Sequence, residues 1–530
     1  MLSLQQLSYK HPNSDLLFNN INLHINSQEK IALIGNNGVG KSTLLRIISG
    51  ELSQSAGSKQ VNVQPYYVPQ LTAQFNELTI AQALGIDHKL KALYAILEGD
   101  ATAENFNILQ DDWGLEDRCR DFFAQWDLPE IHLTQKMANL SGGQKAKILL
   151  AGIQIHQPRL ILLDEPSNHL DLDSKKTLYN WLRSSKDAMI VVSHDRTLLN
   201  LLDDTAEMTP NGIKRYGGNY RFYESQKEIE RHALLHDIHA QEKAVRVAKE
   251  KERETIERQN RLNNRGQKKQ EKAGVARIMM NTLRNNAEKS TSKIKSVHQE
   301  KIGEIRSNLH ELRNSQSALD EIKIDLGNSG FPQGKRIIKA EDINFKYRTQ
   351  KLWEENINLQ VLSGDRIVLQ GKNGSGKTTL IKLLLDHLTP SQGNIQRHNF
   401  TSIYLDQEYS LMASNLSIYD QALQFNIKAL PEHEIKTRLN RFLFGKDDWD
   451  KPCQLLSGGE KMRLIICCLT IKQQTPDLII LDEPTNNLDI QNIRVLSRVI
   501  QNYSGTLIVI SHDETFLQEI GVHKTIYLNT

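Results

Sequence analysis

Short aliphatic runs alternate with amphipathic segments over two long stretches of the chain, residues 1–221 and 335–530. Runs such as LILL (160–163) and TLIVI (506–510) have the length of buried strands, and none approaches the roughly 18 to 20 apolar residues of a membrane span. Strands that alternate with helices predict an α/β fold with a largely parallel sheet in each stretch. The N-terminus also lacks the apolar segment of a signal peptide, so we expect a cytoplasmic protein.

The segment between these stretches, residues 222–334, has a different pattern. Residues 224–330 contain no Phe, Trp or Tyr and are rich in helix formers, which excludes an ordinary globular core and favours long helices. Apolar positions recur at a spacing close to 3.5, which predicts an α-helical coiled-coil hairpin; a disordered charged linker is the alternative. We expect the bend over 263–274, where Gly266 and Gly274 interrupt the rhythm. The apolar positions are Leu234, Ile238, Val245 and Ala248 before the bend, and Ile294, Ile302, Ile305, Leu309, Leu312 and Leu319 after it.

The two α/β stretches are copies of one unit, because the same landmarks follow in the same order in each. GNNGVGKS (35–42) recurs as GKNGSGKT (371–378), LSGGQ (140–144) as LSGGE (456–460), LILLDEPSNHLD (160–171) as LIILDEPTNNLD (478–489), and VVSHD (191–195) as VISHD (509–513). The interval from Glu165 to His194 is 29 residues, and that from Glu483 to His512 is again 29. We call the two copies the first repeat (1–221) and the second repeat (335–530).

Each repeat carries a glycine-rich loop of the form GxxxxGK[ST]. Glycine lets backbone N–H groups close around phosphate oxygens, and the helix that follows adds a positive partial charge at its N-terminus. The lysine is expected to reach the β- and γ-phosphates, so the loops predict ATP, with Mg²⁺, as the ligand. The candidate ATP-binding residues here are Gly35, Asn36, Asn37, Gly38, Val39, Gly40, Lys41, Ser42 and Thr43 in the first repeat, and Gly371, Lys372, Asn373, Gly374, Ser375, Gly376, Lys377, Thr378 and Thr379 in the second.

Two adjacent carboxylates end an apolar run in each repeat. The aspartate is expected at the metal, next to the hydroxyl group of the phosphate loop, and the glutamate at the water that attacks the γ-phosphate. A histidine follows another apolar run, where a neutral imidazole could donate a hydrogen bond to the γ-phosphate. The pattern therefore predicts hydrolysis of ATP to ADP and phosphate in both repeats. The candidate metal ligands are Ser42, Thr378, Asp164 and Asp482, and the candidate catalytic residues are Glu165, Glu483, His194 and His512.

The LSGGQ signature separates this sequence from other phosphate-loop ATPases, and with it both repeats resemble the ATP-binding cassette superfamily. The resemblance implies that each ATP is held by the phosphate loop of one repeat and covered by the signature of the other. It also implies that one glutamine per repeat contacts Mg²⁺ and the attacking water, that one tyrosine stacks on adenine, and that Asp171 and Asp489 couple the two sites. The residues concerned are the signature residues Ser141, Gly142, Gly143, Ser457, Gly458 and Gly459, the glutamines Gln70 and Gln407, which are also candidate metal ligands, and the tyrosines Tyr9 and Tyr347.

One interval differs between the repeats. Gln70 and Ser141 are 71 residues apart, whereas Gln407 and Ser457 are 50 apart, so the first repeat carries about 21 additional residues. We place them in an arm over 85–132, where KLKALYAIL and DRCRDFFAQW predict two helices. The arm is either a surface elaboration or a contact surface.

Positive charge is concentrated at the tip of the hairpin, on both sides of the expected bend. The whole chain has a formal net charge of +3, but residues 258–295 contain eleven Lys or Arg and only two acids. Such a block predicts contact with a polyanion, and without aromatic residues it would bind through charge and shape instead of base stacking. The candidate RNA-binding residues are Arg265, Lys268, Lys269 and Lys272.

Tandem repeats joined by a long helical hairpin, with the lead-in YGGNYRFYE (216–224), resemble the ABC-F family. That resemblance implies a translation factor that binds the ribosome, with the hairpin at ribosomal RNA and tRNA, and relieves stalling, controls elongation or protects against antibiotics. The repeats would form an intramolecular pair, so we expect a monomer. Two alternatives are the ATP-binding subunit of a transporter with separate membrane chains and a DNA-maintenance ATPase.

Overall fold

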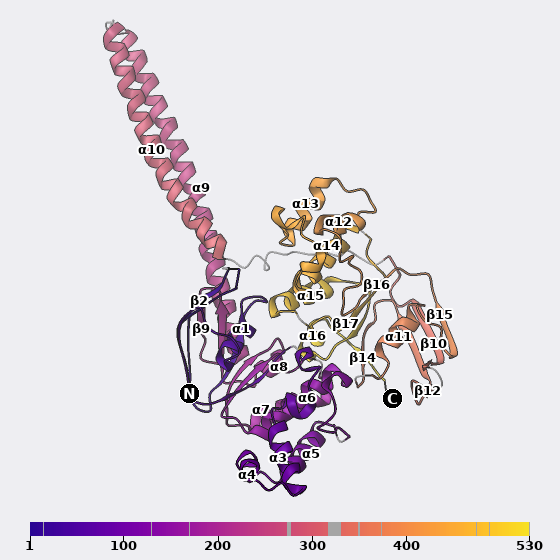
Figure 1. Cartoon of the computed structure of the whole chain (residues 1–530). Coiled ribbons are helices and arrows are strands. Elements are labelled where there is room, and N and C mark those ends of the chain that lie inside the picture. The colour runs from indigo at the N-terminus through magenta and orange to yellow at the C-terminus, as the bar shows by residue number, and fades with distance from the viewer. Residues whose placement is uncertain are drawn as a thin grey trace. The chain divides into compact units, whose positions relative to one another are not determined.

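The computed structural model covers residues 1–530 and describes all of them except 14, 71, 129, 169, 273–276, 316–329, 348–349, 373, 473, 487 and 529–530. The side chains of 266–288, 290, 291, 294, 314 and 315 also lie outside the described part. The chain forms two compact units, Met1–Tyr223 with Ile322–Thr530, and Glu224–Glu321. The first unit contains both repeats and the second is helical (Figure 1).

The first repeat combines a six-stranded sheet of order β5-β6-β7-β3-β8-β9 with a three-stranded antiparallel sheet of order β2-β1-β4. In the larger sheet only the pairing of β8 with β9 is antiparallel. The strands of the first repeat are β1 (Leu2–Lys10), β2 (Leu16–Ile25), β3 (Lys30–Ile34), β4 (Ala56–Val61), β5 (Pro65–Val68), β6 (Leu160–Asp164), β7 (Ala188–Val192), β8 (Asp204–Thr209) and β9 (Gly212–Arg215). Its helices are α1 (Lys41–Ser49), α2 (Ile80–Ala83), α3 (Asp87–Leu97), α4 (Ala103–Leu109), α5 (Leu115–Gln125), α6 (Gly142–His156), α7 (Leu172–Ser184) and α8 (Arg196–Leu199), with 3₁₀ turns η1 (Ala73–Phe75) and η2 (Met137–Asn139).

The second repeat has a five-stranded parallel sheet of order β16-β17-β18-β14-β19 and an antiparallel sheet of order β13-β10-β15. Its strands are β10 (Arg336–Asn344), β11 (Lys346–Tyr347), β12 (Gln350–Lys351), β13 (Ile357–Leu362), β14 (Arg366–Gln370), β15 (Gln392–Arg397), β16 (Ser402–Leu405), β17 (Leu478–Asp482), β18 (Thr506–Ile510) and β19 (Lys524–Tyr527). Its helices are α11 (Lys377–Leu384), α12 (Ile418–Gln424), α13 (Glu432–Arg441), α14 (Gly458–Lys472), α15 (Ile490–Asn502) and α16 (Glu514–Glu519), with 3₁₀ turns η4 (Lys446–Asp448) and η5 (Cys453–Leu455). The α/β prediction is confirmed for both repeats.

Strand alternation explains how the sheet of the first repeat is buried on both faces. Along β6, Ile161 and Leu163 belong to one hydrophobic cluster, and Leu160 and Leu162 to another. Successive side chains of a strand point to opposite faces, so both faces of this parallel sheet are covered. All five residues of β6 are buried, and the same holds for β7 and for β17. This rigid sheet carries the candidate site at the carboxyl ends of its strands.

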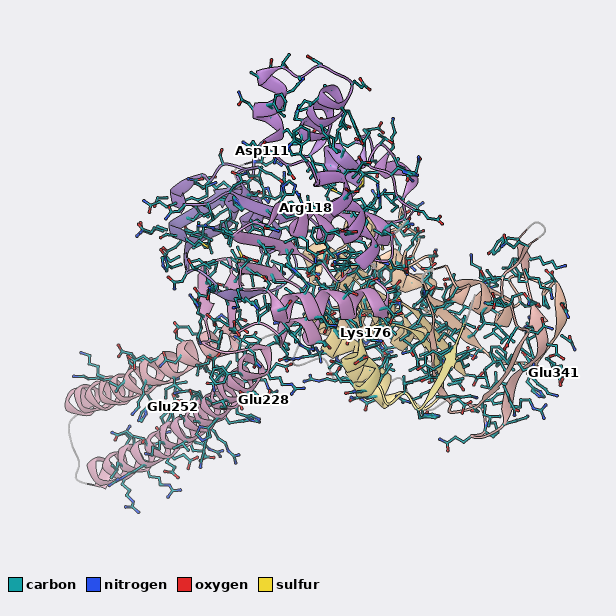
Figure 2. The ribbon with its side chains drawn as sticks, turned by 90° about the horizontal axis from the view of Figure 1, so that it is seen from below. Asp111, Arg118, Lys176, Glu228, Glu252 and Glu341 are labelled. Atoms are coloured by element: carbon teal, nitrogen blue, oxygen red, sulfur yellow. The ribbon has the colours of Figure 1, made fainter. Side chains whose placement is uncertain are left out.

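The arm has more helices than the sequence predicts. Within its described residues the two segments predicted as helices form α3 and α5, which confirms both, and a third helix that was not predicted, α4, lies between them in sequence. The additional helix α4 is only seven residues long, and the side chain of Thr102 caps it by accepting a hydrogen bond from the Asn105 backbone. Asp112 then joins the outer helices, 2.7 Å from Arg118 and 3.4 Å from Lys89. Figure 2 labels Arg118 on this arm.

The helical unit is a two-helix hairpin formed by α9 (Tyr220–Lys272) and α10 (Arg277–Ser315), which lie side by side (Figure 1). Ile238 and Ile302 are 6% and 5% exposed, and Arg313 lies 2.6 Å from Glu242 across the pair. The apolar positions whose side chains are described are all buried or half-buried, which confirms the coiled-coil prediction. The side chain of Glu228, labelled in Figure 2, is exposed on α9.

The predicted bend is misplaced. Helix α9 continues through Gly266 to Lys272, so residues 263–272 are helical instead of forming the turn, and Gly274 lies outside the described residues. A glycine in a helix costs only about 1 kcal/mol relative to alanine, and the surrounding Gln, Lys and Glu residues favour the helix. The loss of apolar rhythm therefore does not mark the end of the helix.

Candidate functional site

The two phosphate loops each join an inner strand of the sheet to a helix, β3 to α1 and β14 to α11. Gly40 has φ 101° and Gly376 has φ 85°, backbone angles that favour glycine, and a Cβ on Gly40 would lie 2.7 Å from the Phe18 ring. The Lys41 ammonium donates to the carbonyl oxygen of Gly35 at 2.7 Å, and Lys377 makes the same bond to Gly371 at 2.7 Å. The lysines are thus folded over their own loops.

The loop residues that would face a ligand are open. A Cβ on Gly38 or Gly374 would meet nothing within 4 Å, although both have left-handed φ values of 81° and 86°. Val39, Ser375 and Thr379 are buried and hold the loops to the core, while Asn36, Asn37, Lys372 and Thr378 are exposed and Gly35, Ser42, Thr43 and Gly371 are half-buried. The predicted residue Asn373 lies outside the described residues.

In each repeat the carboxylate pair lies at the end of β6 or β17. One strand separates it in the sheet from the strand that leads into the phosphate loop. Asp164 is 2% exposed and Asp482 is 5% exposed, and the Thr378 hydroxyl donates to Asp482 at 3.1 Å. Ser42 makes the corresponding hydrogen bond to Asp164. The structure therefore brings together the hydroxyl and carboxylate predicted as metal ligands in each repeat.

The glutamates occupy strained backbone positions. Glu165 has φ 52° and Glu483 has φ 49°, in the left-handed region that non-glycine residues rarely adopt. Each backbone N–H donates to the last residue of the neighbouring strand, Val192 at 2.8 Å and Ile510 at 2.9 Å, which holds the turn in place. Strain of this kind, repeated at equivalent positions, is typical of a functional residue.

The histidines lie against these glutamates. The distance from His194 Nε2 to Glu165 Oε1 is 3.3 Å, and that from His512 Nε2 to Glu483 Oε1 is also 3.3 Å. Burial lowers the pKa of His194 to about 3 and that of His512 to about 4. Both imidazoles are therefore neutral at neutral pH, as the sequence predicts.

Burial has the opposite effect on the carboxyl groups. It raises the pKa of Glu165 to about 8 and that of Glu483 to about 7, and the neighbouring aspartate raises each further. The positive charge of Lys41 opposes the shift at Glu165, and those of Lys175 and Lys377 oppose it at Glu483. Carboxyl groups whose pKa lies near the working pH are suited to accept a proton from water.

Two tyrosines at the site were not singled out from the sequence. The Tyr67 hydroxyl donates to Asp164 at 3.3 Å, and the Tyr404 hydroxyl donates to Asp482 at 2.9 Å. Each stands three residues before the candidate glutamine of its repeat, Gln70 or Gln407, so the repeat itself contained the signal. These bonds orient the buried carboxylates.

The candidate glutamine and tyrosine of the second repeat share a cavity with its phosphate loop. The cavity, of about 370 Å³, is lined by Tyr347, Gln407, Lys377 and Glu483 among others. Tyr347 is 58% exposed and its hydroxyl lies 3.1 Å from Thr379 Oγ1.

In the first repeat the corresponding residues, Tyr9 and Gln70, are half-buried, whereas Tyr347 and Gln407 are exposed. The ring of Tyr9 packs 5.7 Å from His11 and 6.1 Å from Phe18, measured between ring centroids, and Gln70 is half-buried after β5.

A second cavity, of about 330 Å³, is shared by the two repeats. The first repeat contributes Ser141, Gly142 and Gly143, and the second contributes Gly374 and Glu483, with further residues from both. The first signature and the second phosphate loop thus face one space, in the arrangement that the family resemblance implies. Ser141 starts α6 with a capping box, in which it pairs reciprocally with Gln144.

The first phosphate loop is linked to the second repeat as well. The backbone N–H of Asn37 donates to Asp489 Oδ2 at 3.3 Å. Ser457 precedes Gly458 and Gly459 at the start of α14, where its backbone N–H and its hydroxyl both donate to Glu460 Oε2 at 2.8 Å. Among the contacts of the described residues, the cross-repeat link at this site comes from Asp489, one of the two aspartates expected to couple the sites.

The residues at these loops fit ATP and Mg²⁺. Asp164 Oδ1, Glu165 Oε1 and Ser375 Oγ are buried and have no hydrogen-bond partner within the part of the chain that the structure describes. Buried polar atoms are normally paired, so the unpaired atoms of Asp164 and Glu165 in the first repeat, and that of Ser375 in the second, indicate a missing polar ligand in each. Open glycine loops at helix N-termini suit phosphate, and hydroxyl and carboxylate oxygens suit Mg²⁺.

Comparison with known proteins agrees with this site. The sequence model described as "ABC transporter" matches residues 18–168 and 355–486, which makes the fold class two ATP-binding cassettes in one chain. The ATP-binding protein YdiF of Bacillus subtilis is 30% identical, covering 98% of this chain and 79% of that protein, and the ABC transporter F family member 5 of Arabidopsis thaliana is 28% identical, covering 93% and 70%. The chain belongs to the ABC-F family of ATP-binding cassette ATPases.

Solved structures share the fold. An archaeal ribosome recycling factor, aABCE1, crystallised with the ribosomal stalk protein aP1, superposes with a TM-score of 0.61 at 17% identity, covering 98% of this chain and 87% of that chain. At this identity the likeness shows the tandem cassette fold. Among the helices of the described residues, none is both long enough and apolar enough to cross a membrane.

The raised pKa of Glu483 makes stability depend on pH. A carboxyl group whose pKa rises from 4.5 to about 7 on folding stabilises the fold below pH 4.5, and this contribution is lost as the pH rises through 7. In protein free of nucleotide and metal, Glu483→Gln should therefore gain stability over the unchanged protein as the pH rises, by about 3 kcal/mol at about pH 8, since one pKa unit corresponds to about 1.4 kcal/mol. Urea unfolding at several pH values measures this gain. A difference that is constant from acid to alkaline pH would contradict the assigned pKa.

Proposed function

We propose that the protein binds and hydrolyses ATP at two composite sites and acts on the ribosome as a translation factor. The observation that carries the ATPase part is the cavity shared by the Ser141 signature and the Gly374 phosphate loop. ATP bound there would contact both repeats, so its binding favours a closed arrangement of the two. Because both repeats are in one chain, a monomer suffices to build both sites.

The contacts of the site support a role for each residue. Lys41 and Lys377 neutralise the phosphates once they exchange their loop carbonyl partners for phosphate oxygens. The carboxyl groups of Glu165 and Glu483 accept the proton of the attacking water, and the neutral histidine beside each donates to the γ-phosphate.

Mg²⁺, when bound, would offset the negative charge of the phosphate oxygens. The residues that would hold it are Ser42, Asp164 and Gln70 in the first repeat, and Thr378, Asp482 and Gln407 in the second.

The hairpin supports a ribosomal partner over the two rival functions. Residues 258–295 have eleven basic residues and two acids, and this excess of positive charge suits an RNA backbone. A transporter subunit has no use for such a hairpin between its repeats. DNA-maintenance ATPases that resemble this chain carry their coiled coil within one repeat. Closure around ATP and docking of the hairpin on ribosomal RNA and tRNA would then be coupled.

Co-sedimentation separates the three classes. Lysate of cells that produce the protein is layered on a sucrose cushion with ATP, and its membrane fraction and DNA-bound fraction are collected in parallel. We expect the protein in the ribosomal pellet, in an amount that falls when ATP is replaced by ADP. Recovery with membranes or with DNA, and none with ribosomes, would refute the proposal and favour the corresponding alternative.

A further inference from the structure

One cation distinguishes the second ATP site from the first. Helices α7 and α15 begin in the same way: Asp171 caps α7 by accepting from the Ser174 backbone at 3.0 Å, and Asp489 caps α15 by accepting from the Asn492 backbone at 2.8 Å. In α7 the residue that follows Ser174 is Lys175. In α15 the corresponding residue is Ile493, which is uncharged and 1% exposed.

Lys175 belongs to the first repeat but contacts the second. Its ammonium group donates to the backbone carbonyl oxygen of His512 at 3.4 Å. It also lies 3.6 Å from Asp195 Oδ2, and its side chain is 13% exposed. The His512 loop is therefore held from across the boundary between the repeats.

Asp195, the carboxylate that pairs with the Lys175 ammonium group, is itself held in place. Asp195 accepts hydrogen bonds from the backbones of Thr197 at 3.0 Å and Leu198 at 3.1 Å, and from the Tyr179 hydroxyl at 2.5 Å. A side chain with so many partners cannot follow the lysine, so Lys175 is placed with little freedom.

Lys175 also lines the cavity that the repeats share. The same cavity is lined by the first signature, by Gly374 of the phosphate loop, and by Glu483 and His512. A positive charge at a partly buried site that receives the triphosphate acts more strongly than it would in water.

We propose that Lys175 is a positioning residue supplied in trans to the second ATP site, where it fixes the His512 loop and adds a positive charge to the phosphate-facing cavity. The first site has Ile493 at the corresponding place, so the two sites hydrolyse ATP at different rates, with the second site the faster. This inference rests on the ATPase part of the proposed function.

The test measures each site alone. Glu165→Gln leaves only the second site able to turn over, and Glu483→Gln leaves only the first. Lys175→Met, which keeps the length of the side chain without its charge, is introduced into each background, and steady-state ATPase is measured over a range of ATP concentrations. Lys175→Arg is the conservative variant. Lys176→Met is the matched control, because Lys176 is an exposed neighbour on α7 that pairs with Asp173 at 3.3 Å (Figure 2).

We expect Lys175→Met to lower kcat about tenfold in the Glu165→Gln background, with a smaller change in KM, and to leave the Glu483→Gln background unchanged. Lys175→Arg should restore most of kcat, and Lys176→Met should have no effect in either background. Activity retained in the Glu483→Gln background also shows that the variant folds. An equal loss in both backgrounds, or no loss in either, would overturn the assignment of Lys175. If the unchanged protein itself hydrolyses no ATP, the proposed ATPase function fails, and the assignment of Lys175 fails with it.

Discussion

Replacing Glu165 and Glu483 together by glutamine is expected to lower ATP turnover by about a thousandfold, because loss of a general base typically costs a factor of 10² to 10⁴. Glutamine is nearly the same size and its side-chain oxygen can still accept the hydrogen bond from the backbone N–H of the histidine, so ATP binding should survive. The protein would then stay in its ATP-bound arrangement. Single-turnover assays with radiolabelled ATP measure the loss, and filter binding measures the retained ATP.

The same double variant tests coupling to the ribosome. If ATP binding favours the arrangement that docks, the variant should remain in the ribosomal pellet with ATP while the unchanged protein is released after hydrolysis. Glu341→Gln is the matched control, since Glu341 lies on β10 and pairs with Lys339 at 2.5 Å (Figure 2). Equal retention of the double variant with ATP and with no nucleotide would contradict the coupling.

Removing charge near the end of the hairpin should weaken ribosome binding without affecting the ATP sites. The variant changes Arg265, Lys268, Lys269 and Lys272 to glutamine; the side chain of Arg265 is exposed, and those of the three lysines lie outside the described residues. Each cation that pairs with a phosphate releases counterions, so the slope of log affinity against log salt should fall by about one per contact removed. We expect affinity to drop by about 10- to 100-fold at physiological salt, with ATPase activity in the absence of ribosomes unchanged.

A control variant loses the same number of positive charges elsewhere on the hairpin. It shows whether ribosome binding depends on where the charges lie or only on the net charge. Lys227, Arg231, Arg246 and Arg253 lie on α9 and each pairs with a glutamate three or four residues away. Their replacement by glutamine also removes four positive charges, but at positions where acidic partners already offset them. If this control weakens binding as much as the first variant at several salt concentrations, the end of the hairpin has no special role.

The sequence was sufficient to predict the fold and to name residues that the structure brings together at each site. A phosphate loop needs glycine, lysine and a hydroxyl group at fixed spacing. The buried strand that ends in the carboxylate pair needs unbroken apolar residues, so the pattern of LIILDE leaves little choice of structure. The order of these motifs, repeated once, predicts the architecture of the repeats. In the structure the hydroxyl, aspartate, glutamate and histidine of each repeat lie together at the sheet edge.

Other features depend on packing that no local pattern encodes. Tyr67 and Tyr404 reach the aspartates because β5 and β16 lie beside β6 and β17, and strand order is not visible from one strand. The short helix α4 has too few residues for a periodic signal. Gly266 was given too much weight as a breaker, because the helix formers around it dominate. Lys175 gains its contact with His512 only when the two repeats meet.

The central claim is that one ATP is held by both repeats at once. A cryo-EM structure of the Glu165→Gln, Glu483→Gln variant, purified on ribosomes in ATP and Mg²⁺, tests it most directly. The account predicts a triphosphate on the Lys377 loop in contact with Ser141, and a second on the Lys41 loop in contact with Ser457. Nucleotides bound by each repeat separately, with Ser141 and Ser457 turned away from the phosphates, would contradict it.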